Sequence, residues 1–288
     1  MLRVTPTSFR KTAYFVAALA ALVIALTAAP RPFRVYLSLE PQDNVPLPAD
    51  FGEKTEYVFA RLMYPPHPQA RFTRRRMFGG PDMDSRTGGT SWSQDYPRAD
   101  RHFASALRRL TRVHVRSVEQ PVNPDDGDDI YEWPFLTAGE MGDWLLTDAQ
   151  CAKLRDYLLR GGFLFLDDFW GTEEWNRFME SMGRVFPDRP IVEIEDENPI
   201  FHSLYDITER FQIPGAWGIR RGTTFRNDGE VPHWRGIMDD KGRVMVVMTF
   251  NHDVGDSWEY ADERWYPERY SSLGIRLGVN FVLYSMTH

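Results

Sequence analysis

Cysteine is almost absent from this chain of 288 residues, which contains only Cys151. A single thiol excludes an internal disulfide framework and any zinc site built from several cysteines. Basic residues are also in the minority, with 34 Lys and Arg against 41 Asp and Glu. A general nucleic-acid-binding protein would instead carry a basic face, so nucleic acid is not an expected partner.

Hydrophobic residues make up 42% of the chain and aromatic residues 14%, which excludes a disordered protein. The chain has no internal repeat and no low-complexity tract. Its length is sufficient for one large α/β domain with a well-buried core.

Residues 13–29 form an uncharged apolar run, AYFVAALAALVIALTAA, preceded by Arg10 and Lys11. Such a run predicts either an uncleaved signal anchor or a cleaved signal peptide. The anchor is favoured because Pro30 would directly follow the cleavage site. The basic residues before the run then predict an inner-membrane protein with its domain on the periplasmic side. Cleavage would instead release the protein into the periplasm.

The sequence divides into three parts. Residues 1–29 are the predicted signal anchor or signal peptide, and membrane contact is expected through residues 13–29. Residues 30–54 contain five prolines, which predict a semi-rigid linker because proline fixes φ and lacks a backbone donor. Residues 55–288 form the predicted globular domain.

Apolar periodicity in the globular part alternates between the patterns of strands and helices. Strands are expected at 57–64, 113–118, 130–136, 163–166, 191–194 and 243–250, and helices at 99–112, 148–160, 173–185 and 271–286. This alternation predicts an α/β fold with a doubly wound, mainly parallel sheet.

Two adjacent carboxylates, Asp167 and Asp168, follow the apolar run 163–166. Ligands in open α/β sheets bind beyond the carboxyl ends of the strands, so both residues are candidate catalytic groups. Neighbouring side chains on an extended segment point in opposite directions, so the two are not expected to act as a pair. The alternative is that both form caps or turns. His202 is a third candidate, as a general base.

A second candidate site follows the apolar strand 243–250. Its oxygen ligands would suit a divalent cation such as Ca²⁺ or Mg²⁺ and come from Asn251, Asp253, Asp256 and Glu259. The spacing differs from that of an EF-hand loop, so an acidic turn held by side-chain hydrogen bonds is the alternative. No other cofactor is expected.

Further candidates for ligand binding lie near the expected helix 99–112 and in loops. They are Asp95, Tyr96, Arg98, Asp100, Trp170, Asn251 and Trp258. Residues at a helix N-terminus can face an anion, and loop tryptophans can form binding platforms. The competing interpretation is that Asp95 caps the helix and that the tryptophans pack in the core.

The block 146–171, LTDAQCAKLRDYLLRGGFLFLDDFWG, resembles the DUF4159 family, a bacterial domain of unknown function. The resemblance extends over about residues 55–288 through DYPRAD at 95–100, NHDVGDSWE at 251–259 and GVNFVLY at 278–284. It implies a flavodoxin-like fold similar to class I glutamine amidotransferases. The catalytic cysteine of those enzymes follows the Gly-Gly strand, where this chain has Asp168. Cysteine amidotransferase activity is therefore not expected. Asn198 stands where the family usually has histidine.

Three functions remain open on the sequence alone. The leading hypothesis is a membrane-anchored, exported, non-catalytic domain that binds an envelope protein or glycan. A second is a metal-dependent or carboxylate-based hydrolase that uses the acidic strand ends. A third is a structural subunit of a membrane complex.

Overall fold

The computed structural model describes residues 33–42, 46–71 and 84–288. Residues 36–288 form one compact unit. The apolar run 13–29 lies outside the described residues. Within the described ranges, no helix is long and apolar enough to cross a membrane.

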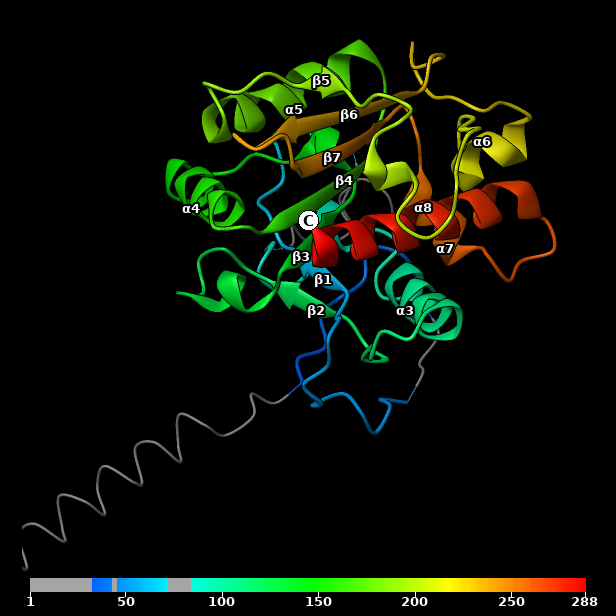
Figure 1. Ribbon diagram of the computed structural model, residues 1–288, viewed down its shortest axis with the longest axis horizontal. Helices are drawn as coiled ribbons and strands as arrows, with labels where there is room; N and C mark the ends of the chain where they lie inside the picture. Colours follow the sequence, from blue (N-terminus) through cyan, green and yellow to red (C-terminus); the bar gives the residue numbers. More distant parts are fainter. Residues whose placement is uncertain (1–32, 43–45, 72–83) are drawn as a thin grey trace, which may run out of the picture. The chain divides into compact units, whose positions relative to one another are not determined.

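Seven strands form a single mixed sheet in the order β2-β1-β3-β4-β7-β6-β5 (Figure 1). Their bounds are β1 Ala60–Leu62, β2 Gln120–Val122, β3 Phe135–Ala138, β4 Phe163–Phe169, β5 Val192–Glu193, β6 His233–Met238 and β7 Val244–Phe250. The strands from β2 to β7 in this order are parallel, and β6 is antiparallel to both of its neighbours. The expected α/β class and mainly parallel sheet are confirmed.

Helices cover both faces of the sheet, with α4 and α5 on one side and α3, α7 and α8 on the other (Figure 1). The α-helices are α3 Arg98–Leu110, α4 Asp148–Leu159, α5 Gly171–Val185, α6 Ala216–Arg221, α7 Val254–Glu259 and α8 Glu268–Thr287. Short 3-10 helices occur at η1 Ser91–Ser93, η2 Asp129–Glu132, η3 Met141–Asp143 and η4 Pro199–Phe201. Every residue of β4 and β7 is buried, as expected for strands covered on both faces.

Several boundaries differ from the sequence prediction. Residues 113–118 make only an isolated bridge, between Val115 and Tyr57, and the strand forms instead at 120–122. Pro121 is tolerated there because β2 is at the edge of the sheet. The segment 130–136 combines the end of η2 with the start of β3, and Pro134 lies between them. The strand β6 and the helix α7 were not predicted.

The compact unit begins before the predicted domain boundary at residue 55. Leu39 is fully buried, and its backbone N–H donates to the Ser93 carbonyl at 3.1 Å. Leu37 forms a parallel bridge with Gly88. Part of the proline-rich segment is therefore integral to the fold, because Leu39 is buried within it.

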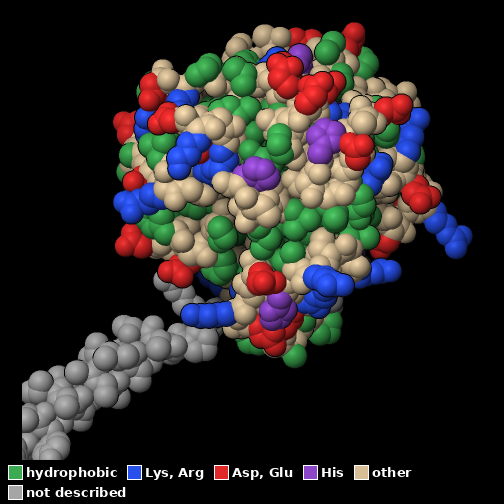
Figure 2. Space-filling model, in the orientation of Figure 1, with side chains coloured by type: hydrophobic (Ala, Val, Ile, Leu, Met, Phe, Trp, Pro, Cys, Tyr) green, Lys and Arg blue, Asp and Glu red, His purple; other side chains and the backbone are tan. Residues whose placement is uncertain are grey.

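Acidic and basic side chains are interspersed on the face shown in Figure 2, with hydrophobic side chains between them. No patch of a single charge dominates this face. The concentration of acidic groups lies instead in a cavity at the carboxyl ends of the parallel strands.

Candidate functional site

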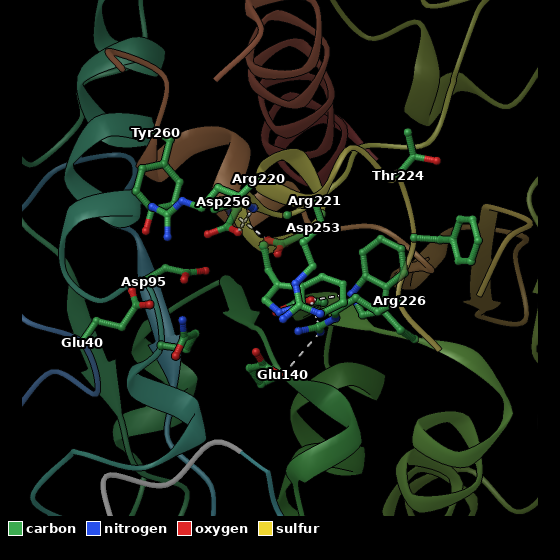
Figure 3. Close-up of a pocket in the computed structure, with 18 residues that line it drawn as sticks. Glu40, Asp95, Glu140, Arg220, Arg221, Thr224, Arg226, Asp253, Asp256 and Tyr260 are labelled. Carbon is green, nitrogen blue, oxygen red and sulfur yellow. Dashed lines mark hydrogen bonds and ion pairs between the residues drawn. The ribbon is translucent and has the colours of Figure 1, made fainter. Parts of the chain in front are cut away.

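A cavity of about 330 Å³ lies where β3, β4 and β7 end, and α6 closes one side of it. This edge of a parallel sheet is where open α/β folds bind ligands. Six carboxylate side chains line the cavity: Glu40, Asp95, Glu140, Asp168, Asp253 and Asp256. Figure 3 shows Glu40, Asp95 and Asp256 directed toward a common space.

Left-handed backbone conformations occur at each strand end that reaches the site. The φ angle is 53° at Glu140 after β3, 53° at Asp168 in β4 and 65° at Asn251 after β7. Asp95, which precedes α3, has a φ of 58°. Such angles are uncommon outside glycine, and they gather at functional sites where the surrounding structure holds them. Three of these residues, Glu140, Asp168 and Asp95, have acidic side chains that line one cavity.

Asp168 is paired with a cation at the base of the cavity. Its Oδ1 atom accepts a hydrogen bond of 2.6 Å from the Arg226 guanidinium and another of 2.6 Å from the Trp170 indole. Glu140 is also close to Arg226, with 3.9 Å between its Oε2 and the guanidinium. Burial, followed by the charge of Asp168, raises the pKa of Glu140 well above its usual range.

Asp167 is held by different partners. The Thr249 hydroxyl donates to its Oδ1, and the backbone N–H of Gly255 donates to its Oδ2 at 2.7 Å. Burial and the neighbouring Asp168 raise its pKa to about 8. Its side chain does not line the cavity, so the carboxylates of Asp167 and Asp168 face different parts of the structure.

Two groups of three carboxylates meet at Asp95. One group consists of Glu40, Asp95 and Glu259, and the other of Asp95, Asp253 and Asp256. In each group the candidate ligand oxygens lie within 4.8 Å of one another. Burial, followed by the charge of Asp256, raises the pKa of Asp95 well above its usual range.

Asp95 and Glu259 have unused oxygen atoms at the centre of these groups. Asp95 is 6% exposed, and no hydrogen bond to its carboxylate occurs within the part of the chain that the structure describes. Glu259 is 2% exposed; its Oε1 accepts from Gln42 at 3.1 Å, whereas its buried Oε2 has no hydrogen-bond partner among the described residues. Buried polar atoms without partners are costly, so these oxygens are suited to bind a cation.

Asp253 and Asp256 shape the turn into α7 as well as the cavity. Asp253 caps the helix by accepting the Asp256 N–H at 2.8 Å, and Asp256 accepts the Ala216 N–H at 2.6 Å. A Cβ atom at Gly215 would lie 2.2 Å from Asp253 Oδ2, so only glycine lets the backbone before α6 approach so closely. The expected acidic turn therefore exists, and its carboxylates face the cavity as well.

Two carboxylates of the group formed by Glu40, Asp95 and Glu259 have pKa values near neutrality. Burial, followed by the charge of Asp256, raises the pKa of Glu40 to about 7. Burial, followed by the charge of Glu40, raises the pKa of Glu259 to about 8. Both groups would lose protons readily if a cation entered between them.

The predicted metal-ligand set is redistributed in the structure. Asn251 is occupied with structural bonds, because its Oδ1 accepts from Gly171 N at 2.8 Å and its Nδ2 donates to Val231 O at 2.6 Å. Glu259 lies with Glu40 and Asp95 rather than with Asp253 and Asp256. Only Asp253 and Asp256 of the predicted four share one group.

Of the other predicted ligand-binding residues, Asp95 and Trp170 line the cavity. Arg98 pairs with Asp262 and Glu263, at 2.9 and 3.0 Å. The remaining three are structural. Tyr96 is buried beside Trp92, Asp100 forms a buried ion pair with Arg61, and the Trp258 ring stacks on Phe103 with 4.4 Å between centroids.

His202 does not line the cavity. It follows η4, where its Nδ1 lies 2.5 Å from an Asp206 carboxylate oxygen and its Nε2 lies 2.8 Å from the Asp196 carbonyl. These two contacts raise its pKa. His202 therefore lies away from the acidic strand ends and is not placed to act there as a general base.

Cys151 is buried on α4, and its Sγ lies 3.8 Å from the Ser181 carbonyl. Burial raises the pKa of the thiol, whereas a nucleophilic cysteine requires a lowered one.

Five charged residues that line the cavity were not predicted from the sequence: Glu40, Glu140, Arg220, Arg221 and Arg226. Glu140 follows an expected strand, so the strand-end rule that selected Asp168 could also have selected it. Glu40 lies in a segment interpreted as a linker, and the arginines have no recognisable motif.

A family model described as a domain of unknown function, DUF4159, matches residues 84–286. The chain belongs to the DUF4159 family. The match includes every cavity carboxylate of this DUF4159 chain except Glu40. No curated protein matches the chain.

Proposed function

We propose that this DUF4159 domain is a non-catalytic ligand-binding domain of the bacterial cell envelope whose cavity holds a divalent cation. The observation that supports the proposal is Asp95, a buried carboxylate that belongs to both three-carboxylate groups and has no hydrogen bond of its own within the described residues.

The physical argument concerns charge. Six carboxylates around about 330 Å³ face only three arginines, Arg220, Arg221 and Arg226. Buried carboxylates must be protonated or neutralised by a partner, and a cation neutralises several at once. Oxygen-only ligands favour hard cations such as Ca²⁺, Mg²⁺ or Mn²⁺.

Two further parts of the proposal concern location and fold. Residues 13–29 would anchor the chain in the inner membrane, with the domain in the periplasm. The parallel strands in the order β2-β1-β3-β4-β7 support a flavodoxin-like arrangement similar to that of class I glutamine amidotransferases.

A second candidate function is a carboxylate-based hydrolase. Glu40 favours it, because a group that lines a cavity and has a pKa of about 7 is suited to general acid–base catalysis at neutral pH. If the protein hydrolyses a substrate, and Glu40→Gln abolishes hydrolysis while retaining cation binding, the hydrolase function is favoured over the non-catalytic one.

The test is a thermal unfolding series on the full-length chain, first treated with a chelator and then titrated with Ca²⁺, Mg²⁺, Mn²⁺ and Zn²⁺. A cation at 100 times its Kd adds about 2.7 kcal/mol of stability. We expect this shift for at least one oxygen-preferring cation. Asp95→Asn should abolish it, and Asp126→Asn, at an exposed position, should retain it. The proposal is wrong if no cation raises the melting temperature or if Asp95→Asn leaves the rise unchanged.

A further inference from the structure

Two arginine side chains line the side of the cavity formed by α6. Arg220 and Arg221 are successive residues of α6, and both line the cavity that contains the six carboxylates. Neither forms an ion pair or a side-chain hydrogen bond within the ranges that the structure describes. Arg226, by contrast, is bonded to Asp168.

Aromatic rings hold the two α6 arginines instead. The Arg221 guanidinium carbon lies 3.9 Å from the centroid of the Trp217 ring, and that of Arg220 lies 4.8 Å from the centroid of the Trp265 ring. A guanidinium stacked on a ring is fixed in orientation while its N–H donors stay available at the edges. Both side chains are thus prepared to bind an anion.

Opposite charges consequently line one cavity, and among the described residues Arg220 and Arg221 form no ion pair with its carboxylates. The carboxylates of Asp95, Asp253 and Asp256 form one group, and Arg220 and Arg221 stand at the α6 side. A ligand that satisfies both must present positive charge to the carboxylates and negative charge to the arginines. A cation that carries a bound anion meets this requirement.

We infer that the cavity binds a phosphate ester, with the phosphate held between a carboxylate-bound divalent cation and the guanidinium groups of Arg220 and Arg221. This inference rests on the cation site proposed above. Arginine donates paired hydrogen bonds that match the oxygens of phosphate, and a divalent cation can bind another of those oxygens.

The size and lining of the cavity favour a small ester. A volume of about 330 Å³ is at the lower end for ligand pockets and fits a phosphorylated monosaccharide rather than a polymer. Trp170, Trp217 and Phe225 line the same space and provide apolar faces for a ring. Without the cation the excess of carboxylates would repel the phosphate, so the ester should bind only after the cation.

The test uses isothermal titration calorimetry on the full-length chain, with or without saturating Ca²⁺ or Mg²⁺. The probes are glucose 1-phosphate, inorganic phosphate and glucose. We expect glucose 1-phosphate to bind only with the cation present and more tightly than inorganic phosphate, and glucose not to bind. Arg220→Gln and Arg221→Gln should each weaken glucose 1-phosphate at least tenfold. The control, Arg109→Gln, changes an exposed arginine on α3 and should have no effect.

The cation-induced rise in melting temperature, measured separately on each variant, distinguishes the two proposals. If the rise occurs and glucose 1-phosphate does not bind, or binds Arg220→Gln and Arg221→Gln as tightly as the parent, the phosphate-ester inference is overturned and the cation site stands. If inorganic phosphate and glucose 1-phosphate bind equally tightly, the inference that the cavity recognises an ester rather than phosphate alone is overturned. No rise with any cation overturns the proposed function and this inference together.

Discussion

Asp167 and Asp168 are neighbours in the sequence, yet their carboxylates bind to different parts of the fold. Asp167 accepts the backbone N–H of Gly255 in α7 at 2.7 Å, whereas Asp168 accepts the guanidinium of Arg226 at 2.6 Å. The first carboxylate attaches β4 to α7, and the second faces the cavity. One sequence motif therefore supplies both a structural group and a candidate functional group.

This division leads to a prediction for Asp167→Asn. We expect a loss of about 1–2 kcal/mol of stability, because the amide cannot accept hydrogen bonds from both the Thr249 hydroxyl and the Gly255 N–H as the carboxyl does. The cation-induced rise in melting temperature should persist. Urea unfolding and cation titration of the same variant measure the two effects, and loss of cation binding would show that Asp167 belongs to the site.

Arg226 should stabilise the cavity most strongly at high pH. Arg226→Gln removes the cation between Asp168 and Glu140, and breaking a buried ion pair costs about 3 kcal/mol. The cost should fall as the pH is lowered, because the carboxyl of Glu140, whose pKa is raised, takes up a proton and no longer needs the cation. Urea unfolding at pH 5 and pH 8 measures this difference, with Arg109→Gln as the control. An equal cost at both pH values would contradict the role given to Glu140.

Stability without a cation should fall as the pH rises. The pKa values of Glu40, Glu259 and Asp167 are raised to about 7, 8 and 8, whereas unfolded carboxyls titrate near 4. The folded protein therefore binds more protons than the unfolded chain between about pH 4 and pH 8, and stability is lost across this window. Each group loses about 1.4 kcal/mol per pH unit below its folded pKa, so three independently titrating groups give a decrease on the order of 10 kcal/mol between pH 5 and pH 8 in chelator, measured by urea unfolding. Added Ca²⁺ should restore the lost stability at pH 8. An increase in stability from pH 5 to pH 8 in chelator would contradict the raised pKa values given to these groups.

The backbone at Glu140 provides a further prediction. Its φ of 53° favours glycine over alanine, so Glu140→Gly should be more stable than Glu140→Ala by about 1 kcal/mol. Both variants remove the same carboxylate, so their difference isolates the backbone conformation. Chemical unfolding at pH 8 measures the difference, and equal stabilities would mean that the chain relaxes around residue 140.

The sequence predicted the parallel strands and long helices well, because their patterns are local. The apolar run 163–166 and the capping residue Thr147 each determine one element by themselves. Edge elements were harder to predict: β2 contains Pro121, and residues 113–118 alternate like a strand but lie before it. Their pairing depends on contacts with distant parts of the chain.

The candidate site was predicted only in part for a related reason. Asp168, Asp253 and Asp256 follow strong strand signals, so the strand-end rule found them. Glu40 and Arg220 come from segments without such signals, and only the tertiary structure brings them to the cavity. Asn251 satisfied the same rule as Asp253, yet its side chain is used to hold the start of α5.

The position of Glu40 shows that the residues matched by the family and the residues needed for the cavity begin at different points of the chain. The family match begins at residue 84, but the cavity also requires Glu40, and Gln42 binds Glu259. A recombinant fragment cut at the family boundary would lose Glu40 and also β1, the strand that pairs with both β2 and β3. The smallest fragment with an intact site therefore begins before the first strand, within a segment whose composition resembles that of a dispensable spacer.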